Sequence, residues 1–253
     1  MTAPIICSTK CLRHTKPRKC WYQATRTDEA VRTCVLSWRW LHPWKFMRCL
    51  RVTSQGVWKK SADDLNKFMS GLLLLRDTGS TLYAVVFDFT YEPSQSEPSD
   101  SEPSDHEPCD GDSAYPNIWI RHVLLCQAQV LSITLFSEWK LVFHGPPLVS
   151  RHLRILELMF LDLNGSILDF SSCPSLEVLK LTECSITTAK ISSRSVKRLS
   201  IQECAFCHDS RTRISVPSIT VLHLDASCAK APFLESNTSL KTAFLSPNSE
   251  IEL

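Results

Sequence analysis

The stretch Ser175-Leu-Glu-Val-Leu-Lys-Leu-Thr-Glu-Cys184 has the form L-x-x-L-x-L-x-x-C. The same form returns 20 residues later, from Val196 to Cys204, and less complete copies lie before and after this pair. The copies begin at Val130, Leu153, Leu176, Val196, Ile219 and Leu240, so the steps between them are 23, 23, 20, 23 and 21 residues. A near-constant step over six copies marks an internal repeat rather than a chance recurrence of apolar residues.

This repeat predicts the fold class, because a period of 20 to 23 residues lies within the range of leucine-rich repeats. Each copy supplies one short strand with alternate side chains on opposite faces. A single unit cannot bury its apolar face alone, so stacked units share one core. We therefore predict an α/β fold, a leucine-rich-repeat solenoid of short parallel strands joined by loops and helices. Its predicted inward residues are Leu156, Leu158, Leu179, Leu181, Leu199, Ile201, Leu222 and Leu224.

The strand alternation also predicts an outward surface. On successive strands the residues between the inward ones face solvent and could contact a target protein. These target-binding candidates are Glu157, Met159, Lys180, Thr182, Arg198, Gln202, His223 and Asp225. We expect the repeat cysteines, Cys184 and Cys204, to be buried in the turn that follows each strand.

Residues 92–116 interrupt the repeat region with an acidic, proline-rich sequence. The pentamer SEPSD occurs twice in succession, and HEPCD follows it. Proline at every fifth residue and abundant charge predict a disordered insert. On either side, apolar residues at helical spacing predict one helix starting at 61 and a second over 117–128. We expect both helices to cover an end of the solenoid. A further strand is predicted over 82–89.

Charge is distributed unevenly along the chain. Residues 1–60 carry 13 Lys and Arg against 2 acids, whereas residues 92–116 carry 8 acids and no Lys or Arg. The basic segment could bind nucleic acid through phosphates. We expect it instead to serve protein contacts, because several of its arginines fall on a predicted helix.

Other classes of function find little support in the sequence. There is no stretch of about 20 apolar residues that could span a membrane, and no secretory signal pattern. The 12 cysteines are therefore expected to be free thiols in the cytoplasm or nucleus. Cys7, Cys11, His14 and Cys20 do not have a zinc-ligand spacing, and Cys204 and Cys207 form a single C-x-x-C. No catalytic motif occurs, so we expect no enzyme activity, no metal and no cofactor.

Four further motifs resemble the plant F-box/leucine-rich-repeat proteins. Residues 28–44, DEAVRTCVLSWRWLHPW, resemble the second half of the plant F-box, and 48–52, RCLRV, resemble the strand after it. Residues 68–76, FMSGLLLLR, resemble a helix of the family, and residues 117–126, NIWIRHVLLC, resemble the helix that precedes its second repeat. The first half of the F-box, with its L-P-D-x-L-L motif, does not precede Asp28.

Composition and the resemblance together divide the chain into four regions. These are a basic segment outside the family pattern that we expect to be disordered (1–27), a partial F-box (28–52), a leucine-rich-repeat domain (53–91 and 117–253) and the disordered acidic insert (92–116). The resemblance also implies a substrate receptor of a Skp–cullin–F-box ubiquitin ligase, with the Skp-type adaptor bound by the F-box remnant. The implied adaptor-binding residues are Val31, Val35, Leu36, Trp38, Trp40 and Trp44. Because the F-box is incomplete, the alternative is a repeat scaffold or decoy that binds targets without the ligase. A nucleic-acid-binding tail on a solenoid is a third reading.

Overall fold

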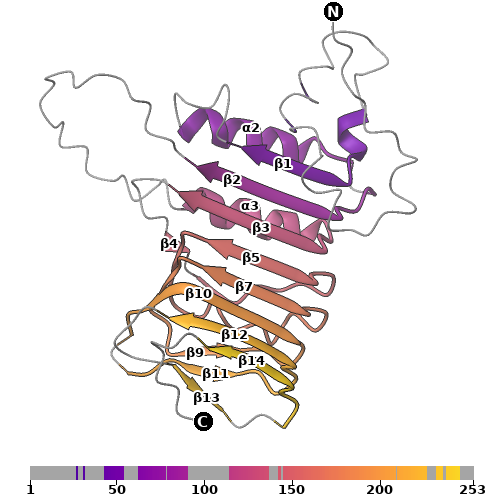
Figure 1. Ribbon diagram of the computed structural model, residues 1–253. Coiled ribbons are helices and arrows are strands. Elements are labelled where there is room, and N and C mark those ends of the chain that lie inside the picture. Colours follow the sequence, from indigo (N-terminus) through magenta and orange to yellow (C-terminus); the bar gives the residue numbers. More distant parts are fainter. Residues whose placement is uncertain are drawn as a thin grey trace, which may run out of the picture.

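A computed structural model shows a stack of parallel strands with a second layer of helices and short strands behind it (Figure 1). It describes residues 27, 31, 43–53, 62–77, 79–90, 114–136, 142–143, 145–208, 210–226, 232–235 and 238–245. Residues 1–26 of the predicted basic segment (1–27), most of the F-box-like helix and residues 92–113 of the predicted insert (92–116) lie outside these ranges.

The main sheet holds one strand from each predicted repeat. Its strands are β1 (Cys49–Thr53), β2 (Ala84–Thr90), β3 (Val130–Phe136), β5 (Ile155–Met159), β7 (Val178–Thr182), β10 (Arg198–Phe206), β12 (Val221–Ala226) and β14 (Thr242–Leu245). Every neighbouring pair is parallel. From β5 onward the equivalent positions of the predicted copies lie side by side. The first copy is a correction, because Val130 pairs with Ile155, so this copy begins at Ala128 and not at Val130 as predicted. The predicted solenoid-like stacking of parallel strands is confirmed.

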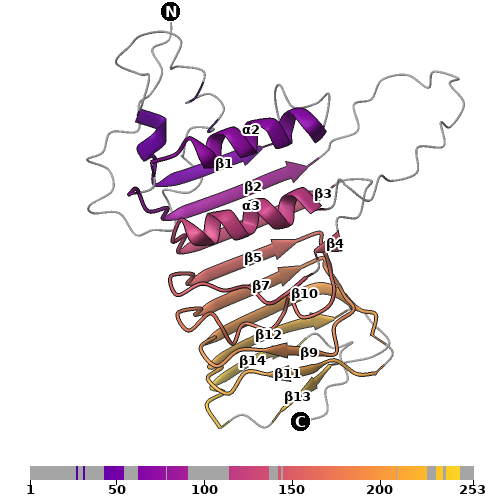
Figure 2. The same cartoon turned by 180° about the vertical axis from the view of Figure 1, so that it is seen from behind.

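Two kinds of element cover the back of this sheet. Behind β1 to β3 lie the helices α2 (Ala62–Leu74) and α3 (Ala114–Leu125), side by side (Figure 2). Behind the later strands the chain makes further short strands. These are β4 (Val142–Phe143), β6 (Asp162–Leu163) and β8 (Ser185–Ile186), then β9 (Lys190–Ser192), β11 (Arg213–Ser215) and β13 (Phe233–Leu234). A 3-10 helix, η5 (Pro43–Phe46), precedes β1.

The helices correct two sequence predictions. They lie against the back of the sheet, not across an open end of the stack, because their apolar faces join the same core as the strands. In addition, α3 begins at Ala114, so residues 114–116 are helical although we assigned them to the disordered insert. Pro116 is compatible with this start, because amide groups in the first helical turn have no partner within the helix.

The predicted inward residues form one continuous core. All eight of them are buried, as are Leu82, Val85 and Phe87 near β2. Across the sheet they make two rows in register, one through Leu131, Leu156, Leu179, Leu199 and Leu222, the other through Ile133, Leu158, Leu181, Ile201 and Leu224. Each large apolar side chain buried in this way contributes about 1.5–3 kcal/mol.

A sharp corner follows three consecutive strands. Phe160, Glu183 and Glu203 all adopt left-handed backbone conformations, with φ values of 59°, 51° and 53°. The next residue in each case, Leu161, Cys184 or Cys204, is buried. The chain then enters β6, β8 or the end of β10, which pairs with β8. The repeat cysteines therefore lie inside the corner, and their predicted burial is confirmed.

Hydrogen bonds of the two cysteines link the corners. The Cys184 thiol donates to the carbonyl of Leu158, with 3.5 Å between sulfur and oxygen. The Cys184 amide donates to the Cys204 sulfur at 3.4 Å. The hydrogen bond between the thiols, together with burial, raises the pKa of the Cys204 thiol. At neutral pH this group stays protonated and serves as a neutral polar link between repeats.

Candidate protein-binding surface

The outer face of the main sheet carries all eight target-binding candidates. In the observed register, Glu157, Lys180 and His223 belong to one row across the strands. Met159, Thr182, Gln202 and Asp225 belong to the next row, and Arg198 lies in a third. Lys180 and Arg198 are exposed and the other six are partly exposed. The structure thus brings the candidates together on one surface.

The charges on this surface are only partly paired. Lys180 on β7 approaches Glu157 on β5, with 2.6 Å between Nζ and Oε1. Such an exposed pair contributes at most about 1 kcal/mol to folding. Among the described residues, no ion pair or hydrogen bond of the Arg198 side chain is found. Arg198 is therefore the cation on this face that is most available to a partner.

A polar and aromatic cluster lies at the carboxy-terminal side of the same face. The Gln202 amide nitrogen is 3.3 Å from Nδ1 of His223 and donates to it in the tautomer that leaves Nδ1 without a proton. The His223 ring meets the ring of Phe244 edge-on, with 5.8 Å between their centres. Phe244 is 56% exposed. Exposed aromatic residues are frequent anchors in protein interfaces. Phe244 was not among the predicted candidates, because its repeat copy is degraded.

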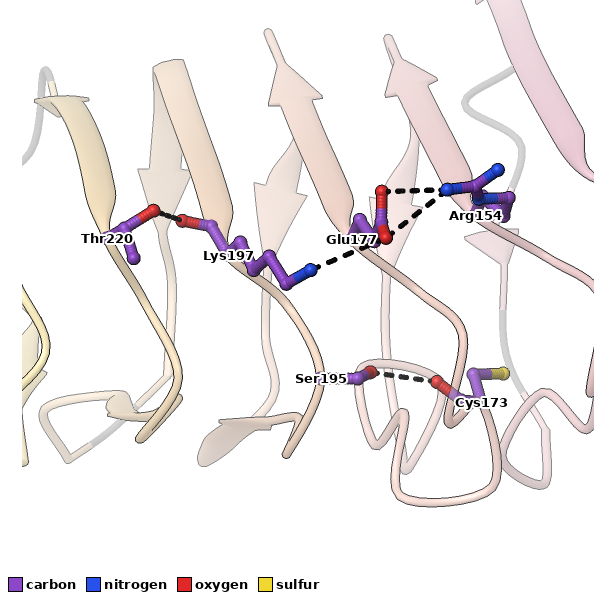
Figure 3. Close-up of polar contacts among 6 residues, drawn as sticks. All are labelled: Arg154, Cys173, Glu177, Ser195, Lys197 and Thr220. Atoms are coloured by element: carbon purple, nitrogen blue, oxygen red, sulfur yellow. Dashed lines mark hydrogen bonds and ion pairs between the residues drawn. The ribbon is translucent and has the colours of Figure 1, made fainter.

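A second set of polar side chains lies where the strands begin, an edge of the main sheet that we call the start rim. Here the Glu177 carboxylate forms two ion pairs, one with the Arg154 guanidinium at 3.3 Å between nitrogen and oxygen and one with Nζ of Lys197 at 3.4 Å (Figure 3). Thr220 continues the row by donating to the Lys197 carbonyl at 2.9 Å. Burial on its own would raise the pKa of the Glu177 carboxyl, but hydrogen bonds and charges from Arg154 and Lys197 outweigh burial and lower it.

Sequence reasoning missed this rim although the repeat contained the signal. Arg154, Glu177, Lys197 and Thr220 each follow the first apolar residue of a repeat copy. Alignment of the copies at that position would have shown charged or polar residues in five of the six, the exception being Leu131 in the copy predicted to begin at Val130. The predicted outer face rested on alternation within the strands, and these four residues stand immediately before the strands begin.

The adaptor-binding candidates are described only in part. Val31 is half-buried and packs against the core, and Trp44 is 9% exposed. Near them, Thr27 is buried, and its hydroxyl accepts a hydrogen bond of 2.8 Å from the Arg51 amide in β1. Val35, Leu36, Trp38 and Trp40 lie outside the described residues.

The structure also bears on metals and membranes. Among the described residues, no three His, Cys, Asp or Glu side chains gather closely enough to hold a metal ion. Cys204 and Cys207 differ in environment, since Cys204 is buried and Cys207 is exposed. In the part of the chain that the structure describes, no helix has the length and apolar character needed to cross a membrane.

Comparison of the chain with protein-family models, with curated proteins and with solved structures returned no match.

Proposed function

We propose that this chain is a non-catalytic protein-interaction module, a leucine-rich-repeat solenoid that captures a target protein on the outer face of its main sheet. The observation that carries the proposal is the separation of the strand residues into two sets. One set is wholly buried, and the other forms a continuous outer face with exposed Lys180 and Arg198. A surface that the core does not need, on a rigid repeated frame, suits recognition of another protein.

The resemblance to plant F-box/leucine-rich-repeat proteins extends the proposal to a substrate receptor of a Skp–cullin–F-box ubiquitin ligase in the cytoplasm or nucleus. In this role the chain carries no active site. It holds the target near the transferring enzyme and so raises the effective concentration of the target there.

A second candidate function is a scaffold or decoy that binds targets without the ligase. Two of the six implied adaptor-binding residues favour it, because Val31 packs on the chain's own core and Trp44 is buried. A few buried anchors normally supply most of the energy of an interface. Anchors that the fold already uses are not available to an adaptor.

Charge reversal on the outer face tests target capture. We expect the double variant Lys180→Glu/Arg198→Glu to lose an acidic target that co-purifies with the tagged full chain. Its unfolding free energy should change by about 1 kcal/mol or less, because both side chains are exposed. The matched control is Lys190→Glu/Arg213→Glu, which makes the same charge change at exposed residues of β9 and β11. Equal capture by the two variants would overturn the assignment of the outer face.

Calorimetric titration of the full chain with a purified Skp-type adaptor distinguishes the two candidates. Submicromolar affinity supports the receptor. Target capture without measurable adaptor binding supports the scaffold or decoy.

A further inference from the structure

The two edges of the main sheet carry opposite charge. Along the start rim, at residues 149–154, 172–177, 193–198 and 238–242, the only acid is Glu177. The same segments expose six cations, Arg151, Arg154, Arg194, Lys197, Arg198 and Lys241. At the opposite edge, where the strands end, residues 159–166, 182–187 and 202–208 contain Asp162, Glu183 and Glu203 but no Lys or Arg.

The start rim is a fixed frame, because neighbouring turns are hydrogen-bonded to one another. Ser150 and Ser193 each accept hydrogen bonds from backbone amides two and three residues further on, and an exposed arginine follows each serine. The hydroxyl of Ser175 then donates to the Arg151 carbonyl at 2.7 Å. Ser218 donates to the Arg194 carbonyl at the same distance. The backbones that carry both arginines are therefore fixed from two sides.

Most of the positive charge on this rim has no acidic partner. Glu177 serves Arg154 and Lys197 together, so one negative charge is shared by two cations. For Arg151, Arg194 and Lys241, as for Arg198, no side-chain ion pair is found among the described residues. A partner that brought carboxylates to these groups would meet uncompensated positive charge on a preformed frame.

The rim also has a hollow that can receive side chains. An open, polar depression of about 480 Å³ is lined by Arg151, His152, Arg154, Ser175 and Glu177, beside Gln129. In segments 149–154, 172–177, 193–198 and 238–242 there is no Phe, Tyr or Trp. Single-stranded nucleic acid is usually held by stacking of its bases on such rings. A carboxylate-bearing peptide fits this rim better than a nucleic acid does.

We infer that the start rim binds an acidic segment of a partner protein, with its carboxylates placed against Arg151, Arg194, Arg198 and Lys241. The inference rests on the proposed function, that the solenoid captures another protein, and it adds the chemistry of the bound segment. The acidic opposite edge repels such a segment and so confines it to the start rim.

The test uses the full chain and a fluorescent peptide of alternating glutamate and serine, with an alternating glutamine and serine peptide as the uncharged control. We expect the acidic peptide alone to bind, with an affinity that falls as salt rises. The variant Arg151→Glu/Arg194→Glu should weaken binding roughly tenfold or more, since each reversal turns an attraction into a repulsion. Lys190→Glu/Arg213→Glu changes the net charge equally and should leave binding within about twofold.

Three results would overturn the inference. These are no binding of the acidic peptide, equal losses in both variants, or tighter binding of a single-stranded oligonucleotide of matched charge, which would make nucleic acid the ligand. Target capture by the outer face is measured separately by comparing the unchanged chain with the single variant Lys180→Glu, because Arg198 belongs to both surfaces. If the peptide fails to bind while the unchanged chain captures its target and Lys180→Glu loses that target, the acidic-segment inference falls and the proposed function stands.

Discussion

The main sheet has a first part, β1 to β3, and a second part, β5, β7, β10, β12 and β14, and the backs of the two parts are covered differently. Behind β1 to β3, helices α2 and α3 bury Met69, Leu72 and Leu73, and then Trp119 and Val123, against the sheet. Behind the later strands the cover consists of short strands and turns, whose buried side chains include Leu163, Ile186, Ile191 and Ile214. Both parts have buried apolar rows in the same register.

The difference shows what each type of cover requires from the sequence. A helix satisfies most of its own backbone hydrogen bonds. Tight turns leave amides and carbonyls that a neighbouring repeat must satisfy. Accordingly, the side chains of Ser150, Ser193 and Thr212 are buried in the strand-backed part, where the two serines accept from backbone amides and Thr212 donates to the Thr188 carbonyl at 2.9 Å. The corners that contain Cys184 and Cys204 are linked in a similar way, because the sulfur of Cys204 accepts from the Cys184 amide of the neighbouring repeat.

The largest expected effect tests whether the two parts are one cooperative core. Leu131 and Leu179 occupy the same row, one over the helices and one over the short strands, and both are fully buried. Replacing either with alanine should lower the unfolding free energy by about 2–5 kcal/mol. Urea denaturation followed by circular dichroism should show one shifted transition in each variant. Leu74→Ala, at a 73% exposed residue of α2, is the control and should be nearly neutral. Two separate transitions would show that the helix-backed part and the strand-backed part unfold independently.

A pH series sharpens the comparison, because it acts on a thiol in the strand-backed part. Burial raises the pKa of the Cys173 thiol to about 11. The folded chain therefore keeps a proton that the unfolded chain releases near pH 9. Its contribution of about 2–3 kcal/mol should be complete below pH 9 and should disappear as pH rises toward 11. Denaturation midpoints between pH 7 and 11 measure this loss, and Cys173→Ala should remove the part that Cys173 contributes. If the denaturation midpoint of Cys173→Ala fell with pH as steeply as that of the unchanged chain, the pH dependence would not come from Cys173.

The smallest of the three effects concerns the cysteine corner. Replacing Cys204 with alanine removes the sulfur that accepts the Cys184 amide and leaves that buried amide without a partner. We expect a loss of about 1–3 kcal/mol in the unfolding free energy. Cys207→Ala changes an exposed thiol and should have little effect. Thiol labelling of the native protein gives a second measurement, in which Cys207 should react well before Cys184 and Cys204. Equal rates would show that the corner opens readily.

The sequence predicted the strand-forming part well because its signal is periodic. Residues such as Leu179 and Leu181 recur at a near-constant step, and alternation along each strand then assigns the buried and outer faces. The amphipathic pattern of α2 identified the buried side of the helix. The pattern does not specify the surface against which that side packs. We expected the helices to cover an end of the solenoid, and they lie against the back of the sheet instead.

Other features left no comparable signal. Glu183 and Glu203 adopt left-handed backbone conformations that usually favour glycine or asparagine, so nothing in their residue type announces the corner. The ion pairs of Glu177 depend on which repeats stack as neighbours. The repeat steps indicated that order, but the side-chain contacts require the register of the turns as well.

The two kinds of cover also predict the curvature of the main sheet. Packed helices need about 8–10 Å between their axes, whereas neighbouring strands need only about 4.8 Å. Helices behind β1 to β3 favour a back layer that is wider per repeat than the sheet, so we expect the outer face to bend inward there. Behind β5, β7, β10 and β12 the cover consists of short strands with the same spacing as the sheet, so we expect this part to be nearly straight. A partner lying over β7, β10 and β12 should then meet a flat surface, and one that extends to β1 should meet a surface inclined to it.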